Sequence, residues 1–215
     1  MTAEEVERAF DLLAEDAAEQ GFVAEIAVFG GSCIMLASDL RQATGDVDAV
    51  FMRNNDFLYE AAERVRSRLD LPEEWLNQAV RQLAPPKGGA QPNLLLFGEY
   101  PRHQRTAVGL RVHMPTPEYI LAMKLLANRL EDDLVKIETD RADIHGLMQI
   151  TGITTYDALA ALMRLCYPMI PGVTESGISP RLEAKLRTIL DEHGGASADP
   201  EPTWRAGRGP TTRDG

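Results

Sequence analysis

The sequence predicts an α/β protein, in which a small mixed sheet of about four or five strands is packed against helices and is followed by a helical C-terminal portion. Three features of the chain favour this class. Helical and strand patterns alternate up to residue 116, only helical patterns follow from residue 117, and a glycine turn joins the first strand to a helix. Alternation of this kind is typical of helices that cover a sheet.

Length, composition and charge describe an ordinary globular chain. It has 215 residues, of which 44% are hydrophobic and 26% are charged, enough for one domain with a helical appendage. The net charge of −11 opposes broad binding to nucleic acid but allows a local basic groove. The acidic N-terminus lacks the apolar core of a signal peptide, and no apolar run approaches the length of a membrane span. We therefore expect a cytoplasmic protein with no membrane partner.

Residues 1–116 are expected to form the α/β core. Residues 3–20 carry an apolar stripe with acidic residues opposite, which indicates an amphipathic helix that Gly21 ends. Asn54 begins a helix-cap signal, and Pro72 stands where a helix would have its first-turn proline. The further elements expected here are helices at 32–40 and 57–69 and strands at 26–29, 46–52, 93–97 and 108–113.

Residues 117–193 are expected to form a helical portion that completes the functional site. A strongly apolar helix is predicted at 119–130, and amphipathic helices are predicted at 154–165 and 179–192. Residues 194–215 have the composition of a disordered tail, rich in glycine and proline. The predicted organisation is therefore an α/β core, a helical portion and a tail.

A glycine turn and a pair of aspartates are the residues most indicative of function. Gly30, Gly31 and Ser32 follow an apolar strand and open a helix, which lets backbone N–H groups and a hydroxyl approach a phosphate. Asp46 and Asp48 begin the next strand, where residues two apart project on the same face. Paired carboxylates are good ligands for divalent cations. The sequence therefore predicts a phosphate cradle beside a metal site.

This arrangement, Gly30-Gly31-Ser32 followed by Thr44-Gly45-Asp46-Val47-Asp48, resembles the catalytic motif of the DNA polymerase β-like nucleotidyltransferase superfamily. In particular, it looks like the small bacterial branch that includes the AbiEii and MenT toxins. The resemblance spans about residues 25–165 and implies a nucleotidyltransferase fold. It also implies that Asp46 and Asp48 are catalytic residues that bind Mg²⁺ or Mn²⁺, and that Gly30, Gly31 and Ser32 bind the nucleotide.

Two later segments extend the resemblance. Lys124 and Arg129 lie in a segment similar to the family's K-L motif with a downstream arginine, which implies that both bind nucleotide and that Lys124 is catalytic. Alternatively, Lys124 extends past its apolar neighbours to bring its ammonium to water. Asp140 and Asp143 match the D-x-x-D pattern that follows this motif, so that one would be the third acid of the site and the other would cap a helix. Asp140 is favoured as the site carboxylate, at the start of that helix.

The resemblance implies transfer of a nucleotide from a nucleoside triphosphate to an acceptor hydroxyl. For the toxin branch the implied acceptor is the 3′ end of tRNA, and the implied partner is a separate antitoxin protein. Thr44 matches a position where the family can carry a phosphorylatable hydroxyl, and a plain strand-entry threonine is the alternative. Two other functions stay open. One is transfer to a small molecule such as an aminoglycoside, which suits an acidic protein; the other is a degenerate domain that binds a nucleotide or a partner without turnover.

Several common sites are excluded by their motifs. The chain contains neither a P-loop nor a dinucleotide-binding glycine pattern. Its four histidines are scattered without a partner at ligand spacing, which opposes a zinc hydrolase. Ser32 is not part of a nucleophile elbow. Cys33 and Cys166 form no metal pattern, and we expect both to be buried free thiols.

Overall fold

The structure of the protein is a computed structural model that describes residues 1–82, 84, 89–102, 107–127, 134–174, 177–194 and 202–205. The chain forms two compact units. Unit 1 contains Met1–Arg81 and Leu94–Pro115, joined by Arg205, and unit 2 contains Gln82–Asn93 and Thr116–Trp204. Each unit has its own set of helices and strands.

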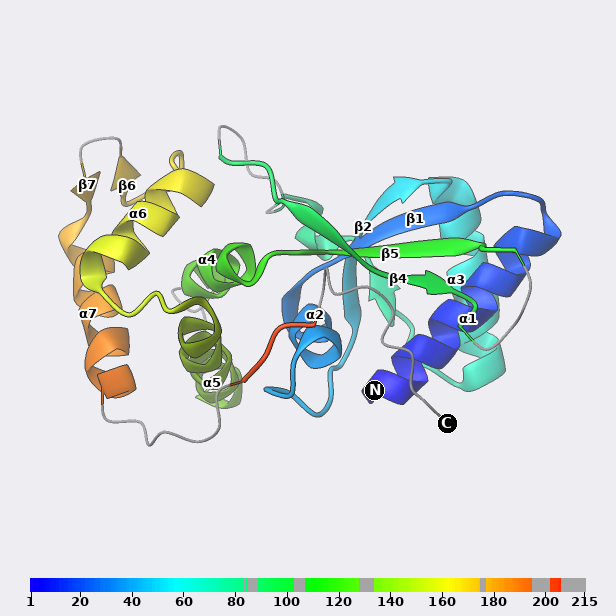
Figure 1. Cartoon of the computed structure of the whole chain (residues 1–215), viewed down its shortest axis with the longest axis horizontal. Coiled ribbons are helices and arrows are strands. Elements are labelled where there is room, and N and C mark those ends of the chain that lie inside the picture. The colour runs from blue at the N-terminus through cyan, green and yellow to red at the C-terminus, as the bar shows by residue number, and fades with distance from the viewer. Residues whose placement is uncertain are drawn as a thin grey trace. The chain divides into compact units, whose positions relative to one another are not determined.

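Unit 1 is built on a five-stranded mixed sheet with the strand order β3-β2-β1-β5-β4 (Figure 1). Strand β1 is antiparallel to β2 and parallel to β5, while β3 is parallel to β2 and β4 is antiparallel to β5. The α/β class predicted from the sequence is therefore confirmed. The strands are β1 (Ala24–Val28), β2 (Val47–Arg53), β3 (Leu76–Asn77), β4 (Leu94–Tyr100) and β5 (Leu110–Pro115).

Three α-helices of unit 1 pack on this sheet. Helix α1 (Ala3–Glu19) contacts β4, β5 and α3 (Asn55–Leu69), while α2 (Gly30–Ala37) and α3 contact β2 (Figure 1). Thr2 starts α1 with a capping box, in which its side chain accepts from the Glu5 N–H and the Glu5 side chain accepts from the Thr2 N–H. The amphipathic pattern thus produces a helix that buries its apolar side against the sheet.

The two faces of the sheet differ in polarity. Ile26 and Val28 of β1 are fully buried, and they pair with the buried Phe51 and Ala49 of β2. Because side chains alternate along a strand, the neighbouring residues of β1 and β2 project on the other face, which includes Asp48. The helices therefore cover the apolar face, and the opposite face carries charged side chains.

Unit 2 is mainly helical. Helix α4 packs on α5 and α6, α6 packs on α7, and α5 also contacts α7. Two very short strands form a hairpin beside α6. The elements are α4 (Pro117–Ala127), α5 (Leu134–Thr151), α6 (Tyr156–Cys166), β6 (Val173–Thr174), β7 (Gly177–Ile178) and α7 (Pro180–Gly194).

Some local predictions need correction. Pro72 opens a turn that Trp75 closes by donating its N–H to the Pro72 carbonyl, and the short strand β3 follows instead of a helix. Strand β3 has only two residues, which are too few to show the alternating pattern that predicts a strand. The 3₁₀ helix η1 (Ala79–Gln82) and the β6–β7 hairpin were not expected either. Elements this short leave too few residues for a periodic pattern.

Two further features concern the end of the chain and its thiols. Trp204 is buried, and the Arg205 N–H donates to the carbonyl of Ala37 at the end of α2 over 2.7 Å.

Cys33 and Cys166 are buried free thiols, as expected, and burial raises the pKa of the Cys166 thiol to about 11. Among the described helices, none has both the length and the apolar character needed to span a membrane.

Candidate metal and phosphate site

The two aspartates of the D-x-D motif flank Val47, the first residue of β2, and both are neighbours of Asn77. Asp48 pairs with Asn77 across the parallel β2–β3 ladder, so the two side chains share a face. The Asn77 amide Nδ2 donates to Oδ2 of Asp46 over 3.2 Å. Between the aspartates, Val47 is fully buried in the core. Asn77 is therefore hydrogen-bonded to the exposed Asp46 and is the ladder partner of the half-buried Asp48.

The glycine turn is in contact with this acid pair. Gly30 has a φ of +62°, a left-handed conformation that strains any residue with a Cβ. A Cβ built on Gly30 would lie 2.7 Å from Oδ2 of Asp48. The Phe29 N–H donates to the Asp48 carbonyl over 2.9 Å, which ties the turn to β2. Glycine is thus required here both by the backbone angle and by the close approach of the carboxylate.

The turn opens directly into the first turn of α2. The first N–H groups of a helix have no partner within that helix, and they carry its partial positive charge. Phe29 is the N-cap residue, and its side chain has no acceptor for these groups. Backbone donors at this helix end therefore face the region next to the Asp48 carboxylate, which is the arrangement used to bind anions.

Ser32 has a different place from the one its motif suggests. It is 1% exposed, and its Oγ donates to the Phe29 carbonyl over 3.0 Å. This hydrogen bond stabilises the first turn of α2. The hydroxyl proton is thus used inside the protein, while the backbone N–H groups remain the donors suited to a phosphate. The predicted nucleotide contact of Ser32 stays a prediction.

Arg41 and Asn77 also lie at this site, and neither is among the site residues predicted from the sequence. A Cβ built on Gly31 would lie 2.5 Å from Nη1 and 2.8 Å from Cζ of Arg41, so the guanidinium is seated directly on this glycine. Arg41 Nε donates to the Ala43 carbonyl over 2.8 Å, which orients the group. The run of glycines gives a partial signal, since a second glycine in a turn often allows a close contact.

Thr44 precedes the acid pair and is almost completely buried. Its Oγ1 donates to the Asp46 carbonyl over 3.0 Å, and its N–H donates to the Met1 carbonyl over 2.9 Å. These bonds hold the chain that leads into β2. A hydroxyl engaged in this way supports the alternative that Thr44 is a structural strand-entry residue.

The predicted residues of the second half of the chain meet one another in unit 2. Nζ of Lys124 lies 2.6 Å from Oδ1 of Asp140 and 2.7 Å from Oδ2 of Asp143. The three side chains are only 11%, 16% and 3% exposed. The ammonium therefore does not extend to water, and the alternative of a solvated Lys124 head group is wrong.

The expected position of these two acids at the start of their helix was also wrong. Asp140 and Asp143 lie in the interior of α5, which begins at Leu134, so neither of them caps the helix and Asp140 is not at its start. Three residues apart, both project from one side of α5 toward Lys124 on α4. Arg129, predicted to bind nucleotide, lies outside the described residues.

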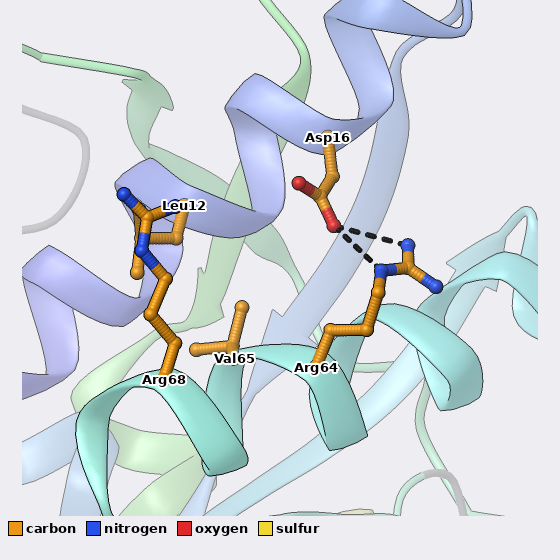
Figure 2. A pocket seen from close by; sticks show the side chains of 5 residues that line it. All are labelled: Leu12, Asp16, Arg64, Val65 and Arg68. Carbon is orange, nitrogen blue, oxygen red and sulfur yellow. Dashed lines mark hydrogen bonds and ion pairs between the residues drawn. The ribbon is translucent and has the colours of Figure 1, made fainter.

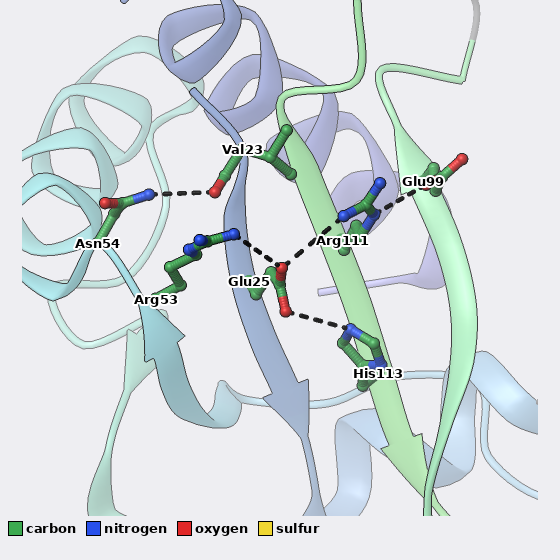
Figure 3. Close-up of polar contacts among 7 residues, drawn as sticks. All are labelled: Val23, Glu25, Arg53, Asn54, Glu99, Arg111 and His113. Carbon is green, nitrogen blue, oxygen red and sulfur yellow. Dashed lines mark hydrogen bonds and ion pairs between the residues drawn. The ribbon is translucent and has the colours of Figure 1, made fainter. Parts of the chain in front are cut away.

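A second group of charges lies on the polar face of the sheet, where Figure 3 shows Glu25 among three basic side chains. Oε1 of Glu25 is 3.6 Å from Arg53 Nη1 and 3.8 Å from Arg111 Nη1, and Oε2 is 3.9 Å from His113 Nε2. Arg111 also donates to Glu99 over 2.9 Å. Burial lowers the pKa of His113, an effect that Glu25 partly opposes. The charges in this group balance one another, so it is a poor anion site.

A shallow hollow between α1 and α3 is separate from the acid pair. It has a volume of about 200 Å³ and is lined by Leu12, Asp16, Arg64, Val65 and Arg68 (Figure 2). Arg64 donates to Asp16 over 3.0 Å, which compensates both charges. The lining has few polar groups that could bind or activate a substrate, so the hollow is a poor candidate for the functional site.

Comparisons with known proteins add no relative to this picture. No protein-family model matches the chain, and it matches no curated protein and no solved structure. Function is therefore inferred from the residues and their geometry.

Proposed function

We propose that this protein is a metal-dependent nucleotidyltransferase with the nucleotidyltransferase version of the α/β fold. The observation that carries the proposal is the contact between an acid and a glycine turn. Oδ2 of Asp48 lies 2.7 Å from the point where a Gly30 Cβ would be, at the N-terminus of α2. A nucleoside triphosphate with its metal needs carboxylates for the cation and N–H donors for the phosphates. Both are present here side by side.

The donor set on β2 suits Mg²⁺ or Mn²⁺. Hard cations prefer oxygen ligands, and Mg²⁺ is commonly bound by one or two carboxylates together with phosphate oxygens of the substrate. Within the described part of the chain, no three His, Cys, Asp or Glu side chains group to hold a metal ion. Asp46 and Asp48 would therefore bind a cation whose remaining ligands come from the triphosphate and water. The bound cation supplies charge neutralisation at the triphosphate.

The residues of unit 1 would bind and orient the triphosphate. The N–H groups at the start of α2 attract phosphate oxygens, and Gly30 allows the chain to come close to them. The acceptor hydroxyl attacks the α-phosphorus and forms a new P–O bond, and its proton is released to solvent water. The bond to the β-phosphate oxygen breaks, and pyrophosphate leaves. Acceleration comes mainly from holding the two reactants in line. The nucleotide-binding roles predicted for Lys124 and Arg129 stay predictions, and so do the catalytic roles predicted for Lys124, Asp140 and Asp143.

For the acceptor we propose the 3′ end of tRNA, with the protein acting as a toxin that a separate antitoxin neutralises. Support for this choice comes from the motif of residues 30–48 alone. A cationic small molecule, such as an aminoglycoside, is the second candidate. The net charge of −11 favours it, because an acidic surface attracts cations and repels the RNA backbone.

One assay separates these acceptors. The purified protein is incubated with Mg²⁺, each ribonucleoside triphosphate labelled at the α-phosphate, and either total tRNA or an aminoglycoside mixture. Label on tRNA supports the toxin proposal, and label on the aminoglycoside supports the second candidate. A folded protein that labels neither and binds no triphosphate contradicts the enzyme assignment. Asp48→Asn, which keeps the size of the side chain but removes its charge, is the matched control.

A further inference from the structure

The side chain of Asn77, at the end of the short strand β3, is held by contacts at both ends of its amide. Nδ2 donates to Oδ2 of Asp46 over 3.2 Å and also to the Glu74 carbonyl over 3.4 Å. Oδ1 accepts from the Ala79 N–H over 2.8 Å. The amide therefore joins the Asp46 carboxylate to the backbone on either side of Asn77.

The hydrogen bond with Ala79 decides which way the amide points. An amide side chain has one acceptor oxygen and one donor nitrogen, and a backbone N–H requires the oxygen. Because Oδ1 faces Ala79, the nitrogen faces Asp46, where it can donate to a carboxylate. Ala79 is the first residue of the 3₁₀ helix η1, so the start of that helix sets the orientation of the amide.

The main chain around Asp46 is held as well. Thr44 Oγ1 donates to the Asp46 carbonyl over 3.0 Å, and the Val47 N–H donates to the Trp75 carbonyl over 2.6 Å. Asp46 is nevertheless exposed, and an exposed side chain ordinarily samples several rotamers. Here the backbone and one carboxylate oxygen both have partners, so the carboxylate is oriented in advance.

Stability alone is a weak reason for this arrangement. The hydrogen bond between Asn77 and Asp46 joins exposed side chains, and such a bond contributes little to folding because water replaces either partner at small cost. A metal ligand gains more from the same contact. Residues that hydrogen-bond to a ligating carboxylate orient it, and their loss typically lowers metal affinity or activity about 10- to 100-fold.

We propose that Asn77 is a positioning residue, which orients the Asp46 carboxylate so that Asp46 and Asp48 bind the same divalent cation. This inference rests on the proposed function, because it assigns a role to the neighbour of a proposed metal ligand. Asn77 is hydrogen-bonded to Asp46 and is the ladder partner of Asp48, so one residue of β3 lies next to both aspartates. It acts through Asp46 and does not itself contact the substrate.

A serine at this position separates the orientation of Asp46 from the start of η1. Asn77→Ser keeps an oxygen that can accept from the Ala79 N–H, as serine does at helix starts. Its hydroxyl ends one bond short of the amide nitrogen, so the contact with Asp46 is lost. Asn77→Thr keeps the same acceptor and suits a strand, which provides a second variant if the serine protein is unstable.

Gln78→Ala is the matched control. It removes a neighbouring hydrogen bond to β2, in which Gln78 Oε1 accepts from the Phe51 N–H over 3.2 Å. The variant Asp46→Ala removes the carboxylate that Asn77 is proposed to orient. In that background, Asn77→Ser should change metal dependence by less than about twofold, because both changes remove the same interaction.

Metal dependence is measured as nucleotide binding, without an acceptor. Equilibrium dialysis with labelled ATP, CTP, GTP or UTP is repeated while the Mn²⁺ concentration is raised. For the triphosphate that binds best, the Mn²⁺ concentration at half-saturation should rise about 10-fold in Asn77→Ser and less than about twofold in Gln78→Ala. At saturating Mn²⁺, Asn77→Ser should bind the triphosphate nearly as well as the wild type, because the nucleotide contacts are unchanged.

The outcomes separate this inference from the proposed function. If the wild type binds a triphosphate with Mn²⁺ and Asn77→Ser needs no more Mn²⁺, the role of Asn77 is refuted and the enzyme assignment stands. An equal rise in Gln78→Ala, or a further tenfold rise when Asn77→Ser is added to Asp46→Ala, would also overturn the inference. If the folded wild type binds no triphosphate at any Mn²⁺ concentration, both proposals fail together. Urea midpoints of all variants show whether any loss comes from unfolding.

Discussion

Asp46 and Asp48 in unit 1 and Asp140 and Asp143 in unit 2 form two pairs of aspartates in opposite surroundings. Asp46 is exposed and Asp48 half-buried. The pair in α5 is mostly buried, and both of its carboxylates lie within 2.7 Å of the ammonium of Lys124. The first pair lies beside an amide and a helix N-terminus, while the second already holds a cation.

This difference indicates different tasks. A buried acid that is paired with lysine has its charge compensated. Removing either partner leaves the other as an unpaired buried charge, which destabilises the folded protein. The other pair, Asp46 exposed just before β2 and Asp48 half-buried within it, lies beside the N-terminus of α2, where we propose that a metal ion and a phosphate bind. We therefore propose cation binding by Asp46 and Asp48 and expect a large contribution to stability from the ion pairs between α4 and α5. Substitutions at the two acid pairs and at the glycine turn test this division.

The largest effect is expected for the acid that contacts the glycine turn. Asp48→Asn should lower nucleotidyl transfer by at least about a hundredfold, because it removes a charge from the metal and phosphate site. Stability should change little, since Asp48 lies on the polar face of β2 and is only half-buried. Transfer rates and urea midpoints of the two proteins provide the comparison. Transfer at the wild-type rate would exclude Asp48 from the mechanism.

In unit 2, by contrast, we expect the main effect of a substitution to be a loss of stability. Lys124→Met keeps the apolar stem but leaves two carboxylates without their cation, one of them 3% exposed, and should destabilise the protein by about 3–5 kcal/mol. Adding Asp140→Asn and Asp143→Asn should recover most of this loss, because no buried charge then remains. Urea unfolding monitored by circular dichroism measures both. A loss below about 1 kcal/mol would mean that water reaches the Lys124 head group.

A smaller effect on stability is expected at the glycine turn. Gly30→Ala places a Cβ on a residue with φ of +62°, which costs about 1–2 kcal/mol. It also pushes against the Asp48 carboxylate, so transfer should fall as well. Gly21→Ala is a matched control, because Gly21 has a φ of +78° but nothing within 4 Å of its Cβ position. If Gly30→Ala behaves like Gly21→Ala in transfer, the close contact with Asp48 has no functional role.

The smallest effect concerns pH and a histidine pair in unit 2. His145 on α5 stacks on His193 of α7 at 5.5 Å, with Glu192 3.7 Å from His145 Nε2 and Arg141 beside Glu192. Burial lowers the pKa of His145 below its ordinary value of 6.5, and the neighbouring His193 lowers it further. Glu192 partly opposes this shift by raising the pKa.

The sign of the pH effect follows from linkage. With its folded pKa lowered, His145 takes up a proton more readily in the unfolded chain, so stability falls as pH drops below 6.5 toward the folded pKa. His145→Gln should flatten the change in urea midpoint between pH 7.5 and 5.5. His113→Gln in unit 1 should act in the same direction, since burial also lowers the pKa of His113. A midpoint that rises on acidification in the wild type, and not in His145→Gln, would contradict this sign.

Local patterns made part of the site predictable. The strand, glycine turn, helix and second strand of residues 24–53 follow from short-range features: two glycines, apolar runs and the two-residue period of a strand. The same period predicts that Asp46 and Asp48 project on one face, at the start of β2. The α/β class follows from the same patterns, repeated along residues 1–116.

Contacts between distant residues made the remainder unpredictable. Asn77 reaches Asp46 only because the two-residue strand β3 pairs with β2, and so short a strand has no periodic signal. Arg41 reaches Gly31 through a loop whose conformation has no sequence rule. The paired state of Lys124 depends on how α4 and α5 are aligned, which follows from side-chain packing rather than from residue spacing.

Metal-dependent nucleotide binding distinguishes a metal bound by Asp46 and Asp48 from one bound by the α5 acids. Wild type, Asp48→Asn and Asp140→Asn are titrated with the best-binding triphosphate, with Mn²⁺ and with EDTA. We expect the gain in affinity that Mn²⁺ gives the wild type to be lost in Asp48→Asn and kept in Asp140→Asn. Metal-dependent binding that survives in Asp48→Asn and disappears in a folded Asp140→Asn protein would contradict the account.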